Sequence, residues 1–140
     1  MSETSLQKIP PAIRRWHEIV AARDGAGLDE LIAADATFYS PIVHTPQRGK
    51  GAVKLYLNAA LATFGGEHFH YVSEWFGPES AALEFMTRID EIEIDGVDLI
   101  GWNESGKIVS FKVMIRPLKA IQIVHQKMGA MLATMQQQQQ

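Results

Sequence analysis

The sequence predicts an α+β fold, in which helices come first, a run of antiparallel strands follows and one further helix closes the chain. Three patterns indicate this order. Apolar residues recur at spacings of three and four up to residue 64, the period changes to two from His68, and a helical spacing returns after Pro117. Helices gathered on one face of a curled antiparallel sheet form an α+β roll, so we expect that architecture here.

The helical elements have recognisable starts and stops. The first helix is expected to begin at Pro10-Pro11, because proline is tolerated in the first turn, and to end at Gly25-Ala26-Gly27. Its apolar stripe contains Ile9, Ile13, Trp16 and Val20. The elements expected next are a short helix over 28–33, a brief strand over 37–40, a proline-rich loop over 41–49 and a long helix over 50–64.

The strand region begins at His68. Strands are expected over 68–76 and 81–90, and two longer ones are joined by the turn Asn103-Glu104-Ser105-Gly106. A bulge is expected at Asp95-Gly96. The last helix is expected to begin at Pro117 and to carry an apolar stripe down to Met135. His125 lies on the same side of the helix as this stripe.

Asp98 is the unusual residue of the long hairpin. Alternation places Asp98, Ile100 and Trp102 on one face of their strand, and Phe111 and Val113 share a face of the next strand. An unpaired carboxylate buried among such residues is costly. Asp98 is therefore expected to be solvated, hydrogen-bonded, protonated or functional.

Composition excludes several classes of protein. The 140 residues predict one domain over 9–135 with flexible tails over 1–8 and 136–140, and a net charge of −3 gives no case for nucleic acid or a membrane surface. The chain has no Cys, which removes disulfides, thiol nucleophiles and zinc–thiolate sites. His68 and His70 share a strand face, but no third ligand has suitable spacing, so neither a metal nor a cofactor is expected. A cytoplasmic protein is expected, since no apolar run is long enough to span a bilayer.

Three segments carry a resemblance to a known family. They are Arg15-Trp16-His17-Glu18-Ile19-Val20, Ala36 to Pro41 continuing to Arg48-Gly49-Lys50, and Asp98 to Ile108. Over about Ile13–Ile115 the chain resembles the nuclear transport factor 2-like superfamily, and within it the SnoaL-like (polyketide cyclase-like) and ketosteroid isomerase-like proteins. The resemblance implies a cystatin-like cone-shaped roll, with the sheet wrapped around the N-terminal helices and an apolar pocket at one end. The C-terminal helix is an addition that would cap the pocket or pair subunits.

The resemblance also implies roles for single residues. Asp98 matches the protonated Asp that donates a hydrogen bond in ketosteroid isomerases, while Ser40 and Trp16 stand where the proton-shuttling Asp and the oxyanion-binding Tyr would be. Steroid isomerisation by that mechanism is not expected, because Ser40 cannot act as a carboxylate base. In the limonene epoxide hydrolase type, Arg88-Ile89-Asp90 fits the Arg-x-Asp pair, but Val113 stands where a further Asp is required.

The candidate site follows from these positions. Asp98 and His44 are the candidate catalytic residues, since the resemblance implies that the loop carrying His44 lies by the pocket mouth and histidine is a common general base. Each also has a structural interpretation, as a hydrogen-bonded Asp and as an exposed loop His. The residues expected to line the pocket are Trp16, Val20, Phe38, Ser40, Tyr56, Leu57, Phe85, Ile100, Trp102, Phe111 and Val113.

Two functions remain open at this point. Under the first, the protein is an acid–base isomerase, cyclase or dehydratase that acts on a small hydrophobic carbonyl compound. Asp98 would then hold the oxygen of this compound and His44 would move the proton. Alternatively, it is a non-catalytic ligand-binding or dimeric accessory domain. In both cases the expected partners are a small hydrophobic molecule and a second copy of the chain, packed through the outer sheet face that carries Lys112 and Met114.

Overall fold

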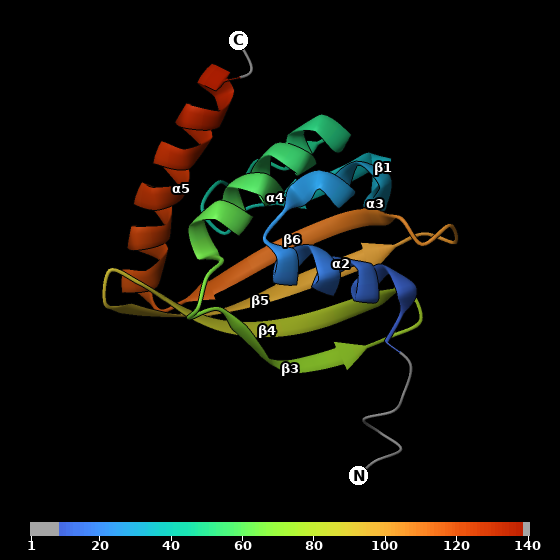
Figure 1. Ribbon diagram of the computed structural model, residues 1–140, viewed down its shortest axis with the longest axis horizontal. Coiled ribbons are helices and arrows are strands. Elements are labelled where there is room, and N and C mark those ends of the chain that lie inside the picture. Colours follow the sequence, from blue (N-terminus) through green and yellow to red (C-terminus); the bar gives the residue numbers. More distant parts are fainter. Residues whose placement is uncertain (1–8, 139–140) are drawn as a thin grey trace.

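The computed structural model describes residues 9–138, so the tail expected over 1–8 and residues 139–140 lie outside the described part. The elements follow the predicted order of helices, strands and a last helix (Figure 1). They are α2 (Pro11–Ala22), the 3₁₀ turn η1 (Gly25–Gly27), α3 (Leu28–Leu31), β1 (Ile32–Tyr39), β2 (Gln47–Arg48), α4 (Lys50–Phe64), β3 (His70–Phe76), β4 (Ser80–Ile89), β5 (Ile92–Trp102), β6 (Ile108–Arg116) and α5 (Leu118–Gln138). The last helix therefore extends into the expected 136–140 tail.

The strands form one curved sheet with the order β2-β1-β6-β5-β4-β3. All neighbours are antiparallel except β1 and β6, which run parallel. The parallel pair departs from the purely antiparallel sheet expected, and it is possible because α4 and β3–β5 form the long connection that parallel strands need. Figure 1 shows α2 and α4 lying on one face of the sheet, and α5 standing at the end where β6 finishes.

The two long helices that cover the sheet are held by simple local features. Helix α2 has Pro11 at its first position and ends at Arg23, whose φ of 53° is left-handed. Helix α4 has the predicted bounds and buries Val53, Leu57 and Leu61. Both helices bury an apolar stripe against the inner face of the sheet, and this packing forms the core.

Two local predictions are wrong. The segment expected as helix to residue 33 turns into β1 at Ile32, because Ile32 pairs with Ile108 of β6. Gly96 is not at a bulge: it continues the β4–β5 ladder directly opposite Phe85, and the β5–β6 register shifts between Gly101 and Trp102 instead. The absence of a Cβ at Gly96 leaves room for the Phe85 ring, which would collide with any side chain there.

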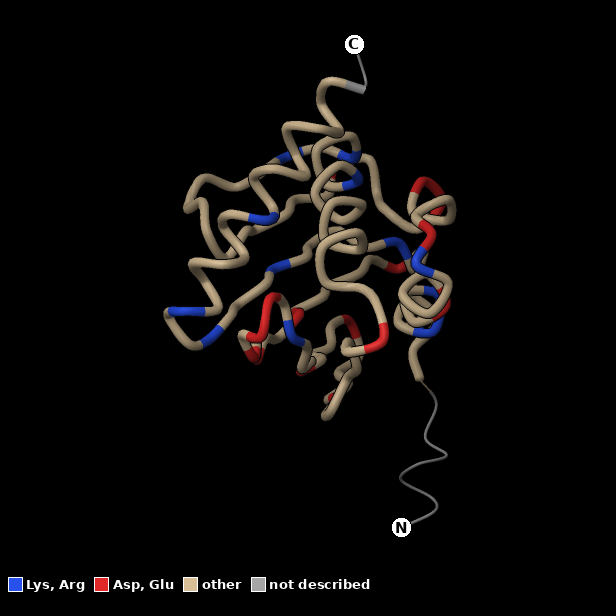
Figure 2. Tube along the Cα trace, turned by 60° about the vertical axis from the view of Figure 1, so that its left-hand side comes forward, with Lys and Arg blue, Asp and Glu red and all other residues tan. Residues whose placement is uncertain are grey.

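Charged residues are spread over the elements, and Lys and Arg do not gather on one side of the trace (Figure 2). Within residues 9–138 no helix combines the length and hydropathy needed to cross a membrane.

Candidate functional site

Asp98 lies on the inner face of β5, between its ladder partners Leu83 on β4 and Val113 on β6. Its exposed fraction is 5%, which makes it the one carboxyl group among the buried polar residues of the described chain. The alternation on which the sequence argument depends therefore placed this carboxyl correctly. Its unusual feature is a neighbourhood of apolar side chains.

A short hydrogen-bond relay reaches Asp98 from helix α2. The indole Nε1–H of Trp16 donates to Tyr71 Oη at 2.9 Å, and the Tyr71 hydroxyl donates to Asp98 Oδ2 at 2.7 Å. Tyr71 comes from β3, and its ring packs edge-on against Phe69 and against His17. The sequence argument missed Tyr71, because only the pairing of β3 with β4 and of β4 with β5 brings it near Asp98, from a position in line with Gly96.

Burial raises the pKa of Asp98 from its ordinary 3.8 to about 7, and the hydrogen bond from Tyr71 opposes this rise. Burial, followed by the nearby Asp98 charge, raises the pKa of Tyr71 well above its ordinary value. Tyr71 therefore stays protonated as a donor, whereas Asp98 changes charge near neutral pH.

The relay borders an apolar cavity of about 50 Å³. Asp98 and Tyr71 are the titratable side chains that line it, and the hydrogen bond from Tyr71 leaves Asp98 Oδ1 available to a bound molecule. The lining residues that the sequence predicted are Trp16, Val20, Leu57, Phe85, Asp98, Phe111 and Val113. Those that it missed are Ala60, Leu61, Phe64, Gly65, Phe69 and Tyr71.

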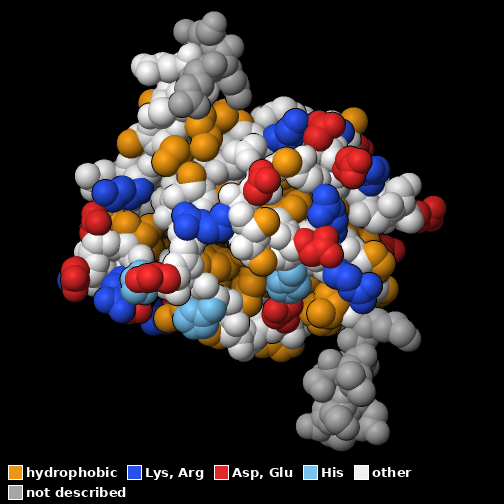
Figure 3. Space-filling model, in the orientation of Figure 1, with side chains coloured by type: hydrophobic (Ala, Val, Ile, Leu, Met, Phe, Trp, Pro, Cys, Tyr) orange, Lys and Arg blue, Asp and Glu red, His pale blue; other side chains and the backbone are white. Residues whose placement is uncertain are grey.

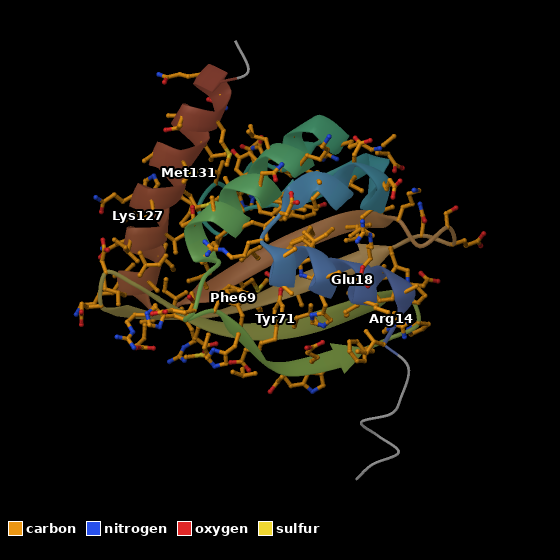
Figure 4. The ribbon with its side chains drawn as sticks, in the orientation of Figure 1. Arg14, Glu18, Phe69, Tyr71, Lys127 and Met131 are labelled. Carbon is orange, nitrogen blue, oxygen red and sulfur yellow. The ribbon has the colours of Figure 1, made fainter. Side chains whose placement is uncertain are left out.

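The cavity lies behind a hydrophobic part of the surface. Figure 4 labels Phe69 and Tyr71 beside α2, and in the same orientation Figure 3 shows hydrophobic side chains at that place with charged and His side chains around them. Next to the Tyr71 ring, His17 Nε2 of α2 lies 2.8 Å from Glu74 Oε1 of β3.

A second cavity of about 170 Å³ lies next to the first, between β1, α4 and α5. The predicted residues Phe38, Ser40 and Tyr56 line this one, so they do not share the Asp98 cavity. The Ser40 hydroxyl accepts hydrogen bonds from the backbone N–H groups of Ile42 (2.9 Å) and Val43 (3.2 Å), which gives it a structural role in the turn.

Three further predicted residues, His44, Ile100 and Trp102, line neither of these two cavities. His44 is exposed on the loop after β1 and lines neither cavity, so the structure does not bring it to Asp98. Ile100 is packed in the core beside Phe111, its ladder partner on β6. Trp102 lies half-buried beyond the shift in the β5–β6 register.

Metal-ligating groups are sparse near these cavities. Across residues 9–138, no three His, Asp or Glu side chains lie close enough together to hold a metal ion. His70 Nδ1 is hydrogen-bonded to the backbone oxygen of His68 at 3.2 Å.

The protein has a curved sheet around helices with an apolar cavity inside. This architecture places it in the class of α+β cone folds. A family model for the SnoaL-like domain matches residues 13–111, which is more than half of the chain. The protein therefore belongs to the SnoaL-like family, as the sequence predicted.

Solved structures support the assignment. A steroid delta-isomerase from Pseudomonas aeruginosa is 38% identical, with a TM-score of 0.84 and coverage of 88% of this chain and 90% of that chain. An uncharacterized protein with a cystatin-like fold from Silicibacter pomeroyi is 32% identical, with a TM-score of 0.82 and coverage of 90% and 88%. The epoxide hydrolase/cyclase-like enzyme SalBIII, at 17% identity, a TM-score of 0.60 and coverage of 75% and 88%, shares the fold. A search of curated proteins finds no match.

Proposed function

We propose that the protein is a metal-independent acid–base isomerase of small hydrophobic carbonyl compounds, with Asp98 as the residue that transfers the proton. The observation that carries this proposal is a buried carboxyl with a pKa of about 7 that borders an apolar cavity. A group with such a pKa exists in both charge states near neutral pH, as proton transfer in both directions requires. Isomerase and cyclase-type structural neighbours are consistent with this chemistry.

A single carboxyl group can both remove and return the proton in the proposed isomerisation. Ionised Asp98 takes a proton from the carbon next to the ligand carbonyl, and the electron pair of that C–H bond moves into an enolate. The carboxylic acid then returns the proton to a different carbon of the conjugated system, so nothing is consumed. Tyr71 holds the carboxyl in place by donating to Oδ2, and the Trp16 indole in turn donates to the Tyr71 hydroxyl. His44, on the exposed loop, has no part in this version of the mechanism.

The test is hydrogen–deuterium exchange at the carbon next to the carbonyl of a small cyclic ketone, followed by NMR in deuterated water. The wild-type protein should accelerate exchange, increasingly as the pH rises through 7, because the ionised carboxyl is the base. Asp98→Asn should lower the protein-dependent rate by about 10²–10⁴-fold. Asp95→Asn, a change of the same kind on the outer face of β5, should leave the rate unchanged.

A binding protein without turnover is the second candidate, and one observation favours it. Apart from Asp98 and Tyr71, no titratable side chain lines the cavity, and the Tyr71 hydroxyl already donates to Asp98. Under this alternative, Asp98→Asn weakens ketone binding while neither protein accelerates exchange. Exchange that is equal in wild type and Asp98→Asn would remove Asp98 from the chemistry altogether.

A homodimer through the outer sheet face remains part of the proposal. Trp75 on β3 and Met114 on β6 are 58% and 50% exposed there, and Val72 adds a third exposed apolar side chain. Large exposed apolar side chains on one face are typical of interaction surfaces. The cytoplasmic location stays a prediction.

A further inference from the structure

The added C-terminal helix forms one wall of the second cavity. Met128, Gly129 and Leu132 of α5 line it opposite Phe38 and Tyr56, and its volume of about 170 Å³ exceeds the roughly 50 Å³ beside Asp98. These α5 residues lie beyond residues 13–111, which match the family model. The wall is thus built from a part of the chain that the family match does not include.

The two cavities are separated by a single layer of side chains. Ala60, Phe64 and Val113 line both of them. Phe64 is the last residue of α4, and its ring packs edge-on against Phe85 with centroids 5.7 Å apart. The space beside Asp98 and the space under α5 are therefore neighbours that share this aromatic side chain as part of their walls.

Helix α5 is anchored firmly enough to act as a wall. Ala120, Ile123 and Val124 are buried in the core, and Lys127 Nζ lies 3.1 Å from Asp90 Oδ2 in the β4–β5 turn. Figure 4 shows Lys127 and Met131 on this helix, which stands beside α4. The cavity that α5 encloses is therefore part of the folded domain.

We propose that the cavity under α5 binds the apolar tail of the ligand whose carbonyl lies at Asp98. The ligand class is an elongated carbonyl compound with an aliphatic or alicyclic tail, and α5 limits the length of that tail. This inference rests on the proposed function for the position of the carbonyl. Most side chains around the α5 cavity are apolar, and the polar ones are accounted for: the Ser40 hydroxyl accepts hydrogen bonds from its own turn, and His125 is exposed to solvent. A tail without polar groups therefore fits this space.

The probe is a homologous series of unbranched methyl ketones of increasing chain length, with dissociation constants measured by isothermal titration calorimetry. In the wild-type protein each added methylene should tighten binding about fourfold until the tail fills the α5 cavity. Gly129→Leu should abolish this gain for the longer ketones and leave the shortest ones unaffected. Gly129 lines the cavity, and a Cβ added there meets no other atom within 4 Å, so a leucine at this position is accommodated without a clash.

The matched control is Ala133→Leu, which adds a similar side chain at an exposed residue of the same helix that does not line the α5 cavity, and it should reproduce the wild-type series. Met128→Ala enlarges the cavity and should extend the gain to longer ketones. Melting curves of each variant verify that the fold is intact.

The outcomes separate this inference from the proposed function. A chain-length dependence that Gly129→Leu removes, without any ketone exchange, keeps the α5 site and refutes the isomerase. A wild-type affinity that does not rise with chain length, or a series unchanged by Gly129→Leu, refutes the α5 site even where exchange depends on Asp98.

Discussion

Strand β5 carries two aspartates on opposite faces of the sheet, and they have different surroundings. Asp95 lies on the outer face, where Arg116 Nη1 donates to its Oδ2 at 2.9 Å, and its side chain is 19% exposed. Asp98 lies on the inner face, where its hydrogen bond comes from the neutral hydroxyl of Tyr71. Because side chains alternate along a strand, an odd separation of these residues is enough to place them on different faces.

The comparison shows that the hydrogen-bonding partner and the access to solvent, more than the residue type, determine the charge state of a carboxyl group. On the outer face Glu84 takes part in the same cluster: a hydrogen bond with Asp95 raises the pKa of Glu84, and Arg116 opposes that rise. The outer carboxyls are compensated by a cation in contact with water. Asp98 has no such cation, so its charge is disfavoured, and this makes it suitable for accepting a proton.

The largest effect should be on the pH dependence of folding stability. The pKa of Asp98 is raised in the folded state, so the folded protein binds this proton more tightly than the unfolded chain does. Its contribution to the free energy of unfolding is present below pH 4 and is lost as the pH rises to about 7, a decrease of up to about 4 kcal/mol. Asp98→Asn should remove that decrease, as measured by urea unfolding at a series of pH values.

Asp95 on the outer face provides the control for this measurement of stability against pH. Asp95→Asn should keep the wild-type decrease, because it alters an exposed ion pair worth about 1 kcal/mol or less. If Asp98→Asn and wild type lose stability in parallel between pH 4 and 7, the inner carboxyl is not the group that titrates, and the contrast between the two faces fails.

A smaller effect is expected from Tyr71→Phe. The change removes the donor to Asp98 and leaves the Trp16 indole N–H without its acceptor, which should cost about 1–3 kcal/mol of the free energy of unfolding. The pKa of Asp98 should also move further upward, because the hydrogen bond from Tyr71 lowers it. NMR titration of the Asp98 carboxyl carbon measures this, and Tyr56→Phe, in the neighbouring cavity, is the control. A pKa that stays in place or falls would show that the relay does not tune Asp98.

The smallest effect on the chain's own stability should come from Trp75→Ser on the outer face. Trp75 is 58% exposed, so its removal should change the stability of a single chain by about 0.5 kcal/mol or less. If the outer face pairs two copies, the variant should instead lower the mass measured by light scattering from that of a dimer toward that of a monomer. A wild-type protein that is monomeric at micromolar concentration would contradict the homodimer.

Local patterns were sufficient for much of the fold. The bounds of α4 follow from its helical spacing and the Gly65-Gly66 stop, and the β5–β6 hairpin follows from alternation around a short turn. The inward position of Asp98 follows from the same alternation. These features depend on residues close together in sequence, so a single chain reveals them.

The rest depended on contacts between distant segments. Tyr71 reaches Asp98 only through the pairing of three strands, and no spacing within β3 marks it as a partner. The split of the pocket residues between two cavities depends on where Phe64 and α5 lie, which periodicity does not specify. His44 was assigned from the position that the family resemblance implies for its loop, and the direction in which a loop turns is likewise a tertiary property.

Gly96 and Phe85 together show how the floor of the Asp98 cavity is made. The Phe85 ring lines the cavity and rests against the bare backbone of Gly96, so its position depends on a residue that has no side chain. Any larger residue at 96 would collide with the ring at 85, so the two positions on neighbouring strands can change in size only together.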